Sequence, residues 1–116
     1  MDLIEQITTV ATGLGWHVNT TSAPSIVEFE FSKYTPAGMD FNFSVEMKGD
    51  NPDSLLDDIE RYYEAFDPDY EASLWIGDDG HGKRGAPYHI KDIVNDMEAA
   101  EKMIDELHET LKKTLK

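Results

Sequence analysis

The stretch around which the fold is organised is NPDSLLDDIERYYEAF, residues 51–66. Asn51 suits the N-cap position, and Pro52 suits the first helical position because its missing N–H is not needed there. The apolar residues recur at helical spacing and form one broad face: Leu55, Leu56, Ile59, Tyr62, Tyr63 and Phe66. The spacing therefore predicts a helix with an aromatic-rich side for a hydrophobic core.

Four acids lie on the opposite side of this predicted helix. At about 100° per residue they fall within about 60° of one another. We name them the acidic stripe: Asp53, Asp57, Glu60 and Glu64. Asp67 and Asp69 follow directly and would extend it. Two interpretations stay open, an ordinary solvated helix face and a surface that meets a basic partner.

The chain has 116 residues, 24 acids and 10 Lys or Arg, so its net charge is −14. The acidity is regional, because residues 40–80 hold thirteen acids and two bases, a net charge of −11, whereas residues 81–116 are neutral. Such a field repels nucleic acid and anionic membranes and attracts basic proteins. The alternative is that the charge only keeps the protein in solution.

The length and the composition limit the class of protein to which the chain can belong. The length fits a single domain, residues 1–116. There is no cysteine, which excludes a disulfide framework. The start of the chain lacks the basic and apolar segments of a signal peptide, and no apolar run approaches the ~20 residues of a membrane span. We therefore expect a cytoplasmic protein of a bacterium or phage.

Apolar periodicity along the chain predicts the remaining elements. Helical spacing covers 3–14, and alternation predicts strands at 16–21, 26–34 and 40–48. A short fourth strand is predicted at 70–76. Residues 87–115 have helical spacing over about 43 Å, so they form one projecting helix or two helices broken near Asn95. The predicted fold class is α+β, a three- to four-stranded antiparallel sheet with helices packed on one face, in the order α-β-β-β-α-(β)-α.

The glycine-rich loop 77–85 offers a weaker candidate site. Lys83 and Arg84 precede a predicted helix start, where an anion could bind, but Asp78 and Asp79 would oppose a phosphate. His81 and His89 lack the spacing of a metal motif, so no metal or cofactor is expected. No catalytic signature is present, which favours a protein without enzymatic activity.

Two resemblances bear on function. The segments GHGKRGAPY (80–88), Asp96-Met97-Glu98 and YTPAGMDF (34–41) resemble a group of short acidic proteins of gut bacteria and their mobile elements. That resemblance implies a bacterial origin and no particular activity. The order of elements and the acidic charge are similar to the small acidic chaperones of type III secretion, which implies an adaptor role.

The leading interpretation is therefore a non-enzymatic acidic protein that engages a basic protein surface, as a nucleic-acid mimic or inhibitor. The alternative is a chaperone-like or adaptor dimer. Its motivation is a heptad spacing that continues from Ile90 to Leu111 and could serve as a self-associating seam or as core. An enzyme is the third alternative.

Overall fold

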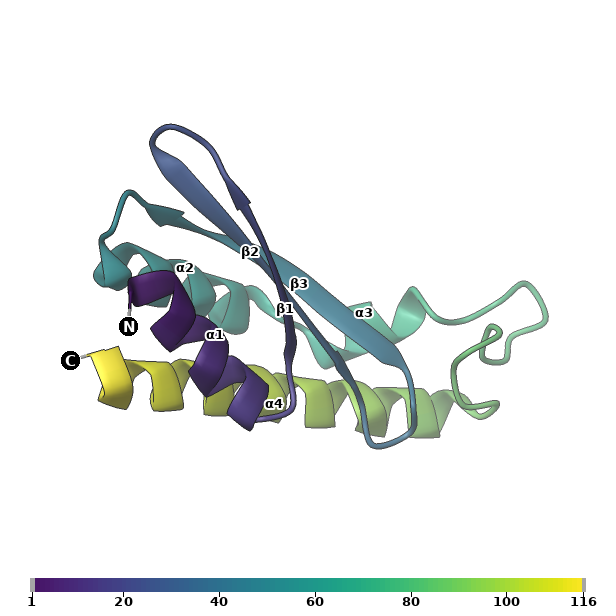
Figure 1. Cartoon of the computed structure of the whole chain (residues 1–116). Coiled ribbons are helices and arrows are strands. Elements are labelled where there is room, and N and C mark those ends of the chain that lie inside the picture. Colours follow the sequence, from purple (N-terminus) through teal and green to yellow (C-terminus); the bar gives the residue numbers. More distant parts are fainter. Residues whose placement is uncertain (1, 116) are drawn as a thin grey trace.

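The computed structural model describes residues 2–115 as three strands and four helices (Figure 1). In chain order they are α1 (Leu3–Gly13), β1 (His17–Ser22), β2 (Ile26–Tyr34), β3 (Asp40–Lys48), α2 (Pro52–Ala65), α3 (Pro68–Ser73) and α4 (Ile90–Leu115). The predicted α+β class is confirmed.

The strands form one antiparallel sheet in the order β1-β2-β3. Phe31 pairs with Phe43, and Phe29 pairs with Val45, so the large side chains of neighbouring strands share one face. Along β3 the side chains alternate strictly between exposed and buried. This alternation fixes the register, since a slip of one residue would put four large apolar groups in water.

Helix α2 begins as the sequence predicts. The Asn51 side chain accepts a hydrogen bond from the Asp53 N–H at 3.0 Å, and Pro52 is the first helical residue. Leu55, Leu56 and Ile59 are buried in the core. The faces of α2 and β3 cover each other, because the ring of Tyr62 stacks on that of Phe43 with centroids 4.6 Å apart.

The predicted strand at 70–76 is wrong, because residues Pro68–Ser73 form helix α3. The start of α3 repeats that of α2: the Asp67 carboxylate accepts from the Asp69 N–H at 3.0 Å, and proline follows the cap. This N-terminal signal outweighs the β propensity of the residues that follow. Only an isolated bridge between Ile76 and Gly82 remains of the predicted strand.

Helix α4 is a single unbroken helix of 26 residues, about 39 Å long, in a molecule whose longest dimension is 47 Å. It contacts α1, α2 and α3 and runs along the helical side of the molecule (Figure 1). It begins at Ile90, three residues after the predicted start. The heptad residues after Ile90 are buried in the core: Ile93, Met97, Ala100, Ile104, Leu107 and Leu111.

A buried carboxylate ties α4 to the hairpin between β2 and β3. Asp96 is only 4% exposed. It accepts hydrogen bonds from the Thr35 hydroxyl and, at 3.0 Å, from the Ala37 N–H. The Thr35 hydroxyl oxygen in turn accepts from the Met39 N–H at 3.0 Å. The position proposed as a helix break is therefore where α4 holds the hairpin.

Candidate functional site

The acidic stripe borders a groove between α2 and the outer edge of β3. The groove has a volume of about 640 Å³. Strand β3 contributes Glu46 and Lys48 to its lining. Helix α2 contributes Ser54, Asp57, Asp58, Glu60, Arg61 and Glu64. The groove is therefore lined almost entirely by polar and charged side chains.

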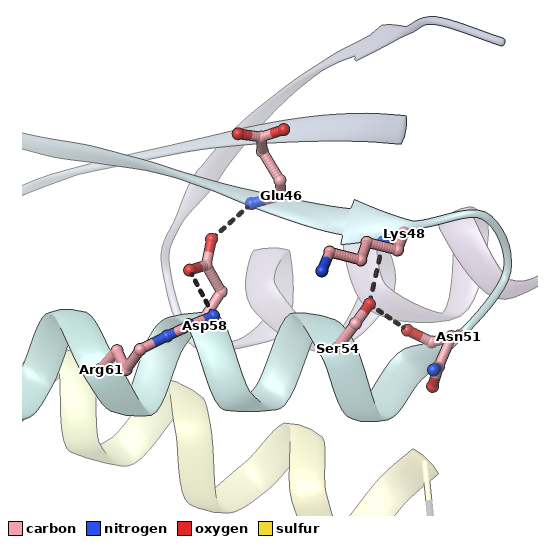
Figure 2. A network of polar contacts seen from close by, with 6 residues as sticks. All are labelled: Glu46, Lys48, Asn51, Ser54, Asp58 and Arg61. Carbon is pink, nitrogen blue, oxygen red and sulfur yellow. Dashed lines mark hydrogen bonds and ion pairs between the residues drawn. The ribbon is translucent and has the colours of Figure 1, made fainter. Parts of the chain in front are cut away.

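Side chains of α2 hold the helix against the strand edge (Figure 2). The Asp58 carboxylate accepts a hydrogen bond from the Glu46 backbone N–H at 2.9 Å. The Ser54 hydroxyl accepts from the Lys48 N–H at 2.8 Å and donates to the Asn51 carbonyl at 2.7 Å. These contacts satisfy backbone donors of an edge strand that would otherwise be open to pairing.

Asp58 was not among the residues predicted for the site, although it builds the groove. It directly follows Asp57 in the sequence, and the helical wheel turns it about 100° away from the stripe, to the border of the apolar face. The available signal was its spacing of four from Ser54, which puts both acceptors on one side of the helix. Two such acceptors can accept hydrogen bonds from the row of backbone N–H groups along a neighbouring strand edge.

The structure brings three of the six predicted partner-binding acids into the groove: Asp57, Glu60 and Glu64. Asp53 is exposed on the first turn of α2, outside the lining. Asp67 caps α3, and Asp69 lies in the first turn of that helix, so both belong to a different element. The candidate site is therefore narrower than the sequence pattern predicts.

The groove has an excess of negative charge. Four carboxylates of α2 line it together with Lys48 and Arg61, which gives a net charge of −2, while the Glu46 carboxylate points away from α2 (Figure 2). Arg61 lies 3.2 Å from Asp58 in an ion pair at the surface. An exposed pair of this kind is worth about 0–1 kcal/mol, so it leaves Asp57, Glu60 and Glu64 available to a cation in the groove.

On the core side of α2, burial raises the pKa of Tyr62 to about 12, with a smaller contribution from the charge of Glu71. Burial also raises the pKa of the Glu71 carboxyl, and the nearby Asp67 adds to that shift. Both shifts disfavour the negatively charged form of the group. Tyr62 therefore stays neutral where its ring stacks on Phe43.

The residues proposed for anion binding lie in a different setting. The Lys83 ammonium donates to the Leu74 carbonyl at 3.1 Å, and its backbone N–H donates to the Trp75 carbonyl at 2.7 Å. Lys83 thus satisfies carbonyls at the end of α3. Arg84 is exposed, and the next helix begins only at Ile90. The two cations are therefore not placed at a helix N-terminus.

The histidines of this loop do not converge on acids. The ring of His81 stacks on Tyr88, with centroids 4.1 Å apart. Across residues 2–115, no three His, Asp or Glu side chains are grouped as metal ligands would be. None of the helices in this part of the chain combines the length and the apolar character needed to cross a bilayer.

Comparison with known proteins found no similarity: no protein-family model, no curated protein and no solved structure matches this chain.

Proposed function

We propose that this protein is a non-enzymatic acidic interaction protein whose groove receives lysine and arginine side chains from a partner protein, in the cytoplasm of a bacterium. The observation that supports the proposal is the position of Asp57, Glu60 and Glu64. These acids line a concave surface between a helix and a strand edge rather than a convex helix face.

A groove of this kind suits a cationic side chain. Carboxylates that line a concavity concentrate negative potential and raise the rate at which a basic partner associates. The acidic charge comes from α2, because the Glu46 carboxylate lies on the side of β3 away from α2 (Figure 2). A carboxylate also accepts two hydrogen bonds from one guanidinium, which favours arginine.

The partner can be a nucleic-acid-binding protein, because the carboxylates of the groove would occupy the positions of phosphates. Acids on α2 alone advance by about 5.5 Å along the helix axis, whereas phosphates of one DNA strand advance by about 3.4 Å. Asp58 of α2 also lines the groove, so the acids there are more closely spaced than in the stripe alone. The function would then be inhibition by occupation of the nucleic-acid site.

The second candidate, a chaperone-like or adaptor dimer, needs a dimer interface other than the heptad residues of α4. The heptad residues after Ile90 pack inside the chain, so the apolar face of α4 is already covered. Catalysis finds less support, since an acid–base pair needs apolar surroundings to shift its pKa, whereas Asp57, Glu60 and Glu64 are exposed.

The test is a charge-neutralising triple variant, Asp57→Asn with Glu60→Gln and Glu64→Gln. A fluorescent oligo-arginine peptide is the probe, and anisotropy gives its Kd at low and at physiological salt. Three exposed contacts worth about 0.5 kcal/mol each predict that the Kd rises about tenfold. The fold should be unchanged or slightly more stable, because like charges at i, i+4 are removed.

The matched control neutralises three exposed acids of α4, Glu98→Gln with Glu106→Gln and Glu109→Gln, and changes the net charge by the same amount. This control should lower affinity only slightly. If both triple variants weaken binding equally, the peptide responds to net charge and the groove is not the site. Unchanged binding by the groove variant would also overturn the proposal.

A further inference from the structure

The two edges of the sheet differ in how well their backbone N–H and C=O groups are covered. Helix α2 covers the β3 edge through Asp58 and Ser54. On the other edge, Ala23 and Ile26 exchange backbone hydrogen bonds of 2.8 and 3.4 Å across the β1–β2 turn. Because antiparallel pairing alternates, every second residue of β1 points its backbone groups away from β2. These outward residues are Val18, Thr20 and Ser22.

The outward backbone groups of β1 are accessible. Five of the six residues of β1 are exposed, and Val18 is half-buried. Within residues 2–115, the outward N–H and C=O groups of Val18, Thr20 and Ser22 have no hydrogen-bond partner. Natural edges are usually blocked by charge, proline, a bulge or a covering element, and β1 has none of these.

Charge is also absent from β1 itself, and the nearest acids are Glu28 and Glu30 on the neighbouring strand β2, where Glu30 accepts a hydrogen bond from the Asn19 side chain at 3.3 Å. Residues 6–27 contain no Asp, Glu, Lys or Arg, although 29% of the chain is charged. This segment includes most of α1 and all of β1. The strongly acidic residues 40–80 form β3, α2 and α3, at and beyond the opposite edge of the sheet. Two copies of this acidic protein therefore meet with less repulsion at the β1 edge than at the β3 edge.

We propose that β1 pairs with β1 of a second copy, antiparallel about a twofold axis at Thr20, to form a continuous six-stranded sheet. This register places Thr20 opposite Thr20 of the partner subunit and Val18 opposite Ser22 of the partner subunit. All three outward residues then exchange bonds, about six in total. A register shifted by two residues leaves some of them unpaired. The pairing is independent of the acidic groove, which stays open at the outer edges.

Cysteine crosslinking tests the register, because the chain contains no cysteine of its own. In this pairing the Cα atoms of position 20 lie about 5.5 Å apart across the axis, within the range of a disulfide. Under mild oxidation, Thr20→Cys should convert most of the protein to a covalent dimer. The matched control is Ser22→Cys, on the same exposed edge, whose Cα atoms are about 13 Å apart and should crosslink far less.

Mass measurement tests the association itself. Light scattering of the unmodified protein should give a mass approaching twice 13.1 kDa at about 100 µM, where a Kd of about 10 µM leaves about 80% of the chains paired. Thr20→Pro should be monomeric, and it should still fold, because the N–H that it removes faces solvent in the single chain. A monomeric unmodified protein, or equal crosslinking at positions 20 and 22, overturns the proposal. A dimer that survives Thr20→Pro with the sheet intact overturns it as well.

Discussion

At Gly82 the chain has no room for a side chain. A Cβ there would lie 1.8 Å from the Pro87 carbonyl oxygen, and the Gly82 N–H donates to the Tyr88 carbonyl at 3.0 Å. The close approach of residues 82 and 87 returns the loop toward the start of α4. Glycine is required here by packing, since its φ is not positive.

We expect Gly82→Ala to lower the free energy of unfolding by about 1–3 kcal/mol, because the loop must move to admit the methyl group. Gly13→Ala is the matched control. Nothing lies within 4 Å of a Cβ at this helical position, so alanine should raise stability by about 0.5–1 kcal/mol. Urea denaturation measures both. Equal effects of the two substitutions would contradict the contact at Pro87.

The tie between Asp96 and the β2–β3 hairpin gives a second prediction at this scale. Asp96→Ala should cost about 2–3 kcal/mol, because the Thr35 hydroxyl and the Ala37 N–H lose a charged acceptor at a buried site. The exposed Glu98→Ala, two residues further along α4, should change stability by less than about 0.5 kcal/mol. Similar losses for the two variants in urea denaturation would show that the tie contributes little.

At the scale of elements, the sequence predicted the sheet and α2 because period and capping agree there. β3 alternates strictly, and the Asn51-Pro52-Asp53 start precedes a wide apolar face. The prediction of a strand from Tyr70 to Ile76 was wrong. The aromatic and β-branched residues of this segment suit a strand, but the Asp67-Pro68-Asp69 start is the signal that decides for a helix. Over this short segment, the N-cap signal for a helix outweighed the β propensity of the residues.

The site was only partly predictable for a related reason. A helical wheel identifies acids that share a direction, and it placed Asp57, Glu60 and Glu64 correctly together. It does not show which strand edge a helix covers, so the role of Asp58 required the tertiary arrangement. Asp67 and Asp69 were assigned to the same surface although they begin another helix.

The capping of the β3 edge predicts a residue-specific exchange pattern. Asp58→Ala should speed hydrogen exchange of the Glu46 amide about fivefold or more, because that amide loses an acceptor worth about 1 kcal/mol. The Lys48 amide should change little. Ser54→Ala should give the converse result, with Lys48 affected and Glu46 spared. If either variant accelerated both amides equally, α2 would be leaving the edge as a unit.

At the scale of the whole molecule, the charge of −14 is poorly compensated. Across residues 2–115, Arg61–Asp58 is the one ion pair between an acid and a lysine or arginine. Salt should therefore stabilise the fold. Between 0.01 M and 0.15 M, where the screening length falls from about 30 to 8 Å, we expect a gain of about 1 kcal/mol and a Tm higher by about 4 °C.

The triple variant Asp57→Asn with Glu60→Gln and Glu64→Gln serves as the control for this measurement. Its net charge is −14 + 3 = −11, so its Tm should rise less with salt. Differential scanning calorimetry gives both values. A Tm that is insensitive to salt in the unmodified protein would mean that repulsion between its acids does not limit stability.

Helix α4 follows in the chain every element that it covers. During synthesis the meander β1-β2-β3 and α2 leave the ribosome first, while the buried residues of Ile93 to Leu111 do not yet exist. At about 5–20 residues per second, the 26 residues of α4 take about 1–5 s to appear. For that interval the nascent domain displays the apolar surfaces of α1 and α2 to the cell. We therefore expect its yield in the cell to depend on how fast the ribosome translates this helix and on chaperones that shield the exposed surfaces until then.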